Sequence, residues 1–159
     1  DGLRAEVEAL RREPESGDAP LRPHAGLRDL DRLAERIRSS GLAVTVDAED
    51  GSADVPAGVD RAAYRIVQEA LTNVLRHGGP EATARVRVAK DGGVLDVEVV
   101  DTGRGTAAPA GSGHGIAGMR ERAEALGGTL EAGPRPAGGF AVRARLPVGD
   151  AAQSVEGSP

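Results

Sequence analysis

The chain has 159 residues and a net charge of −5 with both signs interspersed; it holds one Phe, one Tyr, no Trp and no Cys. This length fits one domain, whose core has to be filled by Leu, Val, Ile and Ala. Disulfides and thiolate metal sites are excluded, the charge pattern argues against a general nucleic-acid binder, and no apolar run approaches the roughly 18–20 residues of a membrane span.

The N-terminal third predicts a helix, a linker, a second helix and a strand. Residues 1–12 have helical apolar spacing, and residues 13–26, rich in Pro, Gly and Asp, predict a linker. A helix is predicted over 27–39, where apolar residues form one stripe, and Gly41 is expected to end it. Residues 42–46 predict a strand.

The clearest element is a helix expected to begin at an N-cap on Asp60 and to stop at Gly78. Strands are expected at 84–89 and 94–100, joined by a hairpin turn over 90–93. A Gly-rich loop over 102–115 leads into a helix at 116–126, which two strands at 129–133 and 139–146 follow. Residues 149–159 have the composition of a disordered tail.

The order of these elements predicts an α/β fold. Helices that alternate with pairs of strands indicate a two-layer α/β sandwich, in which about three helices cover a mixed, mostly antiparallel sheet. The strict alternation of a Rossmann fold and internal repeats are absent. One domain is therefore expected over residues 27–148.

The helix before Gly78 carries a polar stripe at its edge. Glu69, Asn73 and His77 are spaced i, i+4, i+8 and border the apolar face. A stripe in that position suits the wall of a cleft, and a carboxylate with an amide oxygen suits Mg²⁺. The spacing alone favours the simpler interpretation, a helix with ordinary polar residues.

Two glycine motifs follow further along the chain. Asp101, at a strand end, precedes Gly103 and Gly105; its carboxylate could accept a hydrogen bond from an exocyclic amino group such as that of adenine, although Asp-x-Gly turns are common. The loop at 111–118 opens a helix, whose N-terminal amides suit phosphate. It is neither a Walker A loop nor a Rossmann fingerprint.

Taken together and in this order, the three motifs resemble the histidine-kinase-type ATPase superfamily, which gyrase B, Hsp90 and MutL share. RIVQEALTNVLRHG (65–78) resembles its N box, DTGRG (101–105) its first glycine box, and GHGIAGMRERAEALGGTLE (113–131) its second. GGFAVRARLP (138–147) resembles the closing strand. The resemblance covers about residues 27–147, implies a Bergerat-type ATP-binding fold, and is nearest to sensor kinases that pair with LuxR/NarL-type response regulators.

The resemblance also implies roles for individual residues toward ATP and Mg²⁺. Asn73 would coordinate Mg²⁺ and Glu69 would hold a metal-bound water or act as a base. Asp101 would recognise adenine. The further binding residues implied are Arg76 and His77 near the phosphates, Gly103 and Gly105 around the base, and Gly113, His114, Gly115 and Ile116 around the phosphates. Phe140 departs from the family, because many relatives carry a Thr there, and the lid over 106–112 is short.

The phosphoacceptor histidine of such a kinase is not evident in this chain. His24 is interpreted as a solvated loop residue. The resemblance implies that His77 and His114 belong to the ATP site. The acceptor is therefore expected in an upstream dimerisation domain, whose last helix residues 1–12 resemble.

The parent is accordingly expected to be a cytoplasmic or membrane-anchored homodimer that passes phosphate to a response regulator, while this fragment could be a monomer with little autokinase activity of its own. Contacts of the fragment with nucleic acid or membrane are not expected. Alternatives are an anti-sigma-factor-type serine kinase and a non-catalytic nucleotide-binding module.

Overall fold

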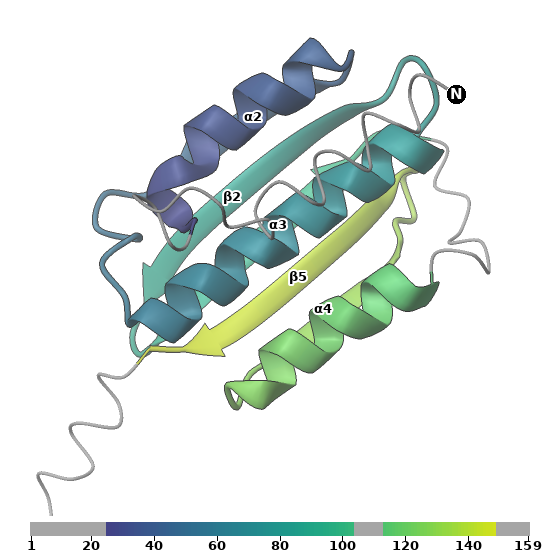
Figure 1. The fold of residues 1–159 in the computed structure, drawn as a ribbon. Coiled ribbons are helices and arrows are strands. Elements are labelled where there is room, and N and C mark those ends of the chain that lie inside the picture. Colours follow the sequence, from purple (N-terminus) through teal and green to yellow (C-terminus); the bar gives the residue numbers. More distant parts are fainter. Residues whose placement is uncertain (1–24, 104–112, 149–159) are drawn as a thin grey trace, which may run out of the picture.

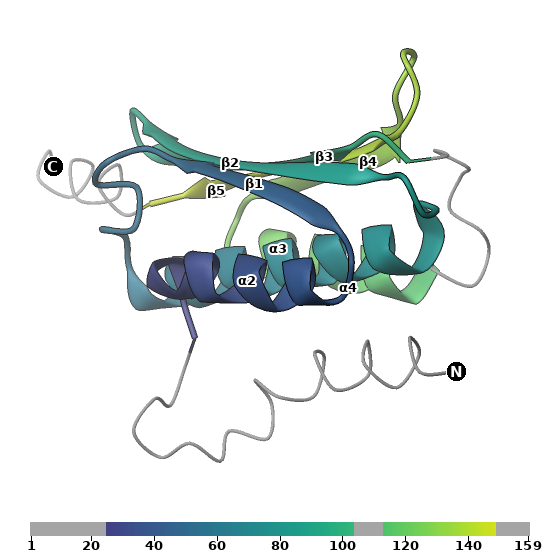
Figure 2. The ribbon, with the colours of Figure 1, turned by 90° about the horizontal axis from the view of Figure 1, so that it is seen from above.

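The computed structural model describes residues 25–103 and 113–148, which form two layers (Figures 1 and 2). One layer is a five-stranded sheet, and the three α-helices lie together on one of its faces (Figure 2). The predicted two-layer α/β sandwich is confirmed. The expected helix at 1–12, most of the linker, the lid and the tail lie outside the described residues.

The order of helices and strands also agrees with the expectation. The elements are η1 (Leu27–Asp29), α2 (Leu30–Ser39), β1 (Ala43–Ala48), α3 (Ala57–His77), β2 (Thr83–Asp91), β3 (Val94–Asp101), α4 (Gly113–Ala125), β4 (Thr129–Pro134) and β5 (Phe140–Pro147). Each strand ends one or two residues later than predicted, because period-2 alternation fades gradually at strand ends.

The sheet is mixed and mostly antiparallel, with the strand order β1-β2-β3-β5-β4. Strands β1 and β2 are parallel, since α3 carries the chain back from the end of β1 to the start of β2. All other pairs are antiparallel. The tight turn between β2 and β3 contains Gly92 at φ +62°, a conformation that glycine adopts without strain.

The core lies between the sheet and the helices and is almost free of aromatic residues, as the composition predicts. On β3 the alternate residues Leu95, Val97 and Val99 are buried under the helices, and Tyr64 of α3 is the largest fully buried side chain. Each such burial contributes about 1.5–3 kcal/mol. This apolar contact holds α3 along the middle of the sheet (Figure 1).

The start of α3 differs from the prediction. The helix begins at Ala57 after Pro56, so Asp60 is not its N-cap. Pro56 and Asp60 are both helix-start signals, since proline pre-sets the backbone and an acid in the first turn suits the helix dipole. Asp60 instead accepts a hydrogen bond from the Leu27 backbone N–H at 2.8 Å, which joins η1 to α3.

The predicted stop at Gly78 is confirmed, with its N–H bonded to the Val74 carbonyl at 2.8 Å. The last helix, α4, begins at Gly113, three residues earlier than expected. Within the described residues, no helix combines the length and apolarity that a membrane crossing requires.

We expect Asp60→Ala to lower the free energy of unfolding by about 1–2 kcal/mol, because the half-buried Leu27 N–H loses its acceptor. Urea denaturation measures this change. Asp60→Asn is the matched control, since its amide oxygen still accepts the hydrogen bond. Equal stability of Asp60→Ala and the parent chain would contradict this account.

Candidate functional site

The polar edge of α3 lies against the first turn of α4. A Cβ added to Gly115 would lie 2.6 Å from Glu69 Oε2 and 3.5 Å from Asn73 Nδ2. At the other end of the two helices, a Cβ on Gly58 would lie 3.7 Å from Leu126. The helices are therefore antiparallel, and the absence of a side chain at Gly115 lets α4 begin directly beside a carboxylate and an amide.

Asn73 presents an unsatisfied oxygen at this contact. Its Oδ1 is buried and has no hydrogen-bond partner among the described residues; the Thr72 hydroxyl is the other such atom, for which the described residues offer no explanation. A buried acceptor left unpaired costs about 1–3 kcal/mol. An amide oxygen is also a ligand that Mg²⁺ accepts. The unpaired Oδ1 could therefore bind a metal ion or accept a hydrogen bond from a ligand.

Protein side chains alone do not surround a metal here. The described residues contain no group of three or more His, Cys, Asp or Glu placed to hold one. Mg²⁺ commonly binds through one or two protein oxygens together with waters and substrate phosphates. Asn73 Oδ1 with the neighbouring Glu69 fits that mode of binding.

Asp101 lies at the end of β3 and is only 6% exposed. One carboxylate oxygen, Oδ1, accepts a hydrogen bond from the Gly103 backbone N–H at 2.7 Å. The other accepts none from a described residue. The Gly103 N–H therefore fixes one oxygen of this largely buried carboxylate, and the other oxygen could accept a hydrogen bond from a ligand.

The Asp101 motif is packed onto the C-terminal end of α3. A Cβ on Gly103 would lie 2.6 Å from the Gly78 Cα and 2.7 Å from its carbonyl oxygen. Gly78 follows Asn73 by five residues, which is about 7.5 Å along a helix axis. Backbone contact between these two glycines therefore holds the carboxylate motif at a short, set distance from the Asn73 amide.

The hairpin between β4 and β5 also contacts Asp101, which the sequence analysis did not predict. Gly139, at φ +90°, lies against the Asp101 carbonyl, with no room for a Cβ. The Arg135 guanidinium donates a hydrogen bond to the same carbonyl at 3.4 Å. In the sequence, the adjacent residues Gly138 and Gly139 are the pattern from which such a close backbone approach could have been predicted. Phe140 is half-buried against the core on the helix side of β5, next to Asp101 in the strand register.

The other predicted site residues are more scattered. Arg76 is exposed and Ile116 is half-buried against the core. Gly113 and His114 form the start of α4, although the side chain of His114 is not described; Gly105 lies outside the described residues. The structure thus brings together Glu69, Asn73 and Gly115, and separately Asp101, Gly103 and the end of α3.

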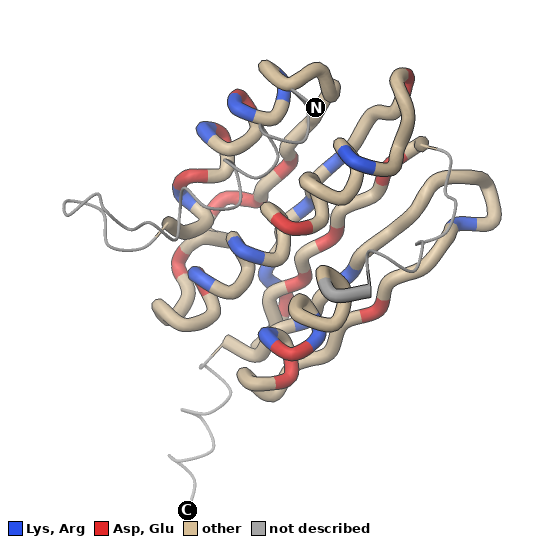
Figure 3. The backbone as a smooth tube through the Cα atoms, turned by 45° about the vertical axis from the view of Figure 1, so that its right-hand side comes forward, with Lys and Arg blue, Asp and Glu red and all other residues tan. Residues whose placement is uncertain are grey.

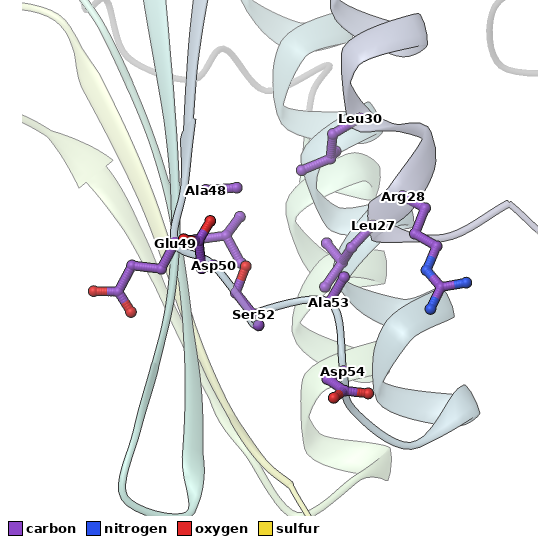
Figure 4. A pocket seen from close by; sticks show the side chains of 11 residues that line it. Leu27, Arg28, Leu30, Ala48, Glu49, Asp50, Ser52, Ala53 and Asp54 are labelled. Atoms are coloured by element: carbon purple, nitrogen blue, oxygen red, sulfur yellow. The ribbon is translucent and has the colours of Figure 1, made fainter.

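A cavity of about 410 Å³ lies at the end of the sheet opposite to Asp101 (Figure 4). Leu27 and Leu30 line one side and the acidic Glu49 and Asp50 the other. Val88 of its lining is four residues from Ala84, the β2 partner of Asp101, and so about 13 Å along the strand. No predicted site residue lines this cavity.

The surroundings of His77, the last residue of α3, favour the neutral form of its imidazole ring. Partial burial lowers its pKa below the ordinary value of 6.5, and the adjacent Arg76 charge lowers it further. The neutral ring is therefore favoured in the folded chain. When the pH falls below 6.5, the unfolded chain binds a proton that the folded chain resists, so stability decreases.

We expect the His77 ring to titrate by NMR with a midpoint below 6.5. The free energy of unfolding should decline as the pH drops from 6.5 toward that midpoint. His77→Gln should lack this part of the pH dependence. A midpoint above 6.5, or identical pH profiles for the two chains, would refute the environment described for His77.

The chain is similar to proteins of a known family. Residues 58–150 match the family described as Histidine kinase-, DNA gyrase B-, and HSP90-like ATPase. Over 125 residues the chain is 36% identical to the sensor histidine kinase YxjM of Bacillus subtilis, a match that covers 77% of this chain and 30% of that protein. The chain thus spans about a third of the length of this relative.

Solved structures support the fold. The histidine kinase domain of the Erythrobacter litoralis EL346 blue-light activated histidine kinase superposes with a TM-score of 0.63 at 24% identity, covering 92% of this chain and 78% of that one. The mycobacterial sensor histidine kinase MprB superposes with a TM-score of 0.56 at 22% identity, covering 76% and 94%. The chain therefore belongs to the histidine kinase-, DNA gyrase B- and HSP90-like ATPase family, as an ATP-binding domain of the kind found in sensor histidine kinases.

Proposed function

We propose that this domain binds ATP with Mg²⁺ and donates the γ-phosphate to a histidine on an upstream dimerisation domain of a sensor kinase. The buried, unpartnered Oδ1 of Asn73 beside the glycine start of α4 is the observation that carries the proposal. A metal ion or a hydrogen-bond donor of a bound ligand would satisfy this atom. The amides at the start of α4 lie next to it.

Mg²⁺ would be held by Asn73, with Glu69 beside it to orient a metal-bound water. The ion would neutralise charge on the phosphates. The first amides of α4, with no partner inside the helix, favour the negative charge of phosphate oxygens. Gly113 and Gly115 have no side chains that would cover these amides. His114 and Ile116 belong to the same first turn of α4, so their backbone amides would also face the phosphates.

The adenine would be recognised by Asp101. Its second carboxylate oxygen is available to accept a hydrogen bond from the exocyclic amino group. Gly103 lets the backbone approach the flat ring. Phe140 supplies an apolar wall in place of the hydroxyl that many relatives carry, so recognition of the base would depend more heavily on Asp101.

The phosphoryl transfer would need mainly positioning and charge neutralisation. A ring nitrogen of the acceptor histidine would form a bond to the γ-phosphorus as the bond from that phosphorus to ADP breaks, and the ring would release its proton. Arg76 and His77 lie at the end of α3 from which an acceptor could approach. In a homodimeric parent, a response regulator, of the LuxR/NarL type by resemblance, would receive the phosphate next.

We expect Asp101→Asn to weaken binding of a fluorescent ATP analogue with Mg²⁺ about tenfold or more. The Asn oxygen would keep the bond from the Gly103 N–H, so the amide NH₂, a donor, would replace the second carboxylate oxygen that is proposed to accept from the adenine amino group. Asp96→Asn is the matched control, since Asp96 lies on the same strand but on the face away from the helices. Anisotropy titration measures both variants. Wild-type affinity in Asp101→Asn would rule out the proposed base contact.

We expect Gly115→Ala to weaken binding of the same analogue about tenfold, because the added methyl group meets Glu69 and Asn73. Gly118→Ala, in the same helix with nothing within 4 Å of the added Cβ, should bind normally and be up to about 1 kcal/mol more stable. Thermal unfolding separates misfolding from lost binding. Equal affinities for the two variants would count against a phosphate and metal site at this contact.

A further inference from the structure

The face of the sheet away from the helices carries an ordered set of charges. Figure 3 shows acidic and basic positions interspersed along the strands. In the strand register, one row crosses all five strands with alternating sign. The row consists of Asp47, Arg87, Glu98, Arg143 and Glu131.

This row is compensated internally. Arg143 also forms a two-point ion pair with Asp96, at 3.1 and 2.7 Å. The hydrogen bond from Arg143 lowers the pKa of the Asp96 carboxyl, and the nearby Arg145 and Arg87 lower it further. Each basic residue of the row therefore has an acidic neighbour on the same face.

In the neighbouring row of the same face, the basic residue Arg85 has no acidic neighbour. Its register neighbours are Thr45 on β1 and Val100 on β3, neither of which is acidic. Arg85 lines a groove of about 730 Å³ that also includes Arg135. Among the charged groove residues Arg85, Arg87, Arg135 and Glu98, three are basic and one is acidic.

The floor and walls of this groove are suited to an extended chain. Val100, Ala141 and Ala43 are short and apolar, so a peptide backbone could approach the sheet closely. Thr45 and Thr83 add hydroxyl groups along the sides. A guanidinium binds a carboxylate through two parallel hydrogen bonds, which gives Arg85 and Arg135 a preference for acidic side chains.

We propose that this arginine groove binds an acidic, extended segment of a partner protein. The net positive lining is the charge complement of such a segment, and Arg85 in it has no acidic neighbour in the strand register. The groove opens on the opposite face of the sheet from the proposed ATP site, and the two regions border each other at Thr102 and Arg135. Along β3, Val100 points to the groove and Asp101 to the helices, since successive residues face opposite sides.

The test uses the whole chain and a short fluorescein-labelled oligoglutamate peptide, followed by anisotropy. We expect Arg85→Gln to weaken the peptide affinity about tenfold. Arg145→Gln is the matched control, because Arg145 is exposed on the same face but lies outside the groove and opposite Asp96. It removes the same charge and should change the affinity less than about twofold.

Three results would overturn the proposal. The first is no binding of the peptide at low ionic strength, or binding only to phosphatidylserine vesicles. The second is an equal loss in the two variants, which would mean attraction to net charge alone. The third is displacement of the peptide by the ATP analogue, which would place the peptide in the nucleotide site. Nucleotide affinity of Arg85→Gln should stay unchanged, so this test is independent of the proposed kinase function.

Discussion

The burial of one face of α3 on the sheet is the constraint on which the rest of the domain depends. Ala63, Ile66 and Val67 are completely buried there, and Val74 continues the same stripe toward the end of the helix. A helix whose face is buried in this way cannot rotate about its axis without exposing apolar surface. The polar edge beside that stripe is thereby set in direction, so the side chains proposed to meet Mg²⁺ project toward α4 rather than into solvent or core.

Close backbone approaches at glycine then bring the remaining parts of the site to α3. Gly115 brings the start of α4 to the polar edge, Gly103 brings the end of β3 to Gly78, and Gly139 brings the last hairpin to Asp101. In each case a Cβ would meet atoms already in place. The proposed nucleotide site needs a carboxylate, an amide oxygen and helix amides near one another, and these glycine contacts bring the segments that carry them together.

Successive side chains of β3 point to opposite faces of the sheet, so this strand contributes residues to two surfaces. Its odd-numbered residues from Leu95 pack under the helices and end at Asp101, whereas Asp96, Glu98 and Val100 belong to the open face. The proposed ATP site and the proposed partner groove would therefore lie on opposite faces of the sheet. Arg135 contacts both regions, because it lines the groove and donates to the Asp101 carbonyl.

The element order and the two layers were predictable from the sequence, because apolar periodicity and glycine signals are local properties of the chain. The roles of the motif residues toward a nucleotide stay a prediction. Local signals misplaced the start of α3, since Pro56 and Asp60 both mark helix starts and only the contact with Leu27 decides between their roles. The pairing of Gly103 with Gly78, the contact of the last hairpin with Asp101 and the charge imbalance around Arg85 were decided by tertiary structure alone. Each depends on strand register and on atoms far apart in the chain, which no local pattern encodes.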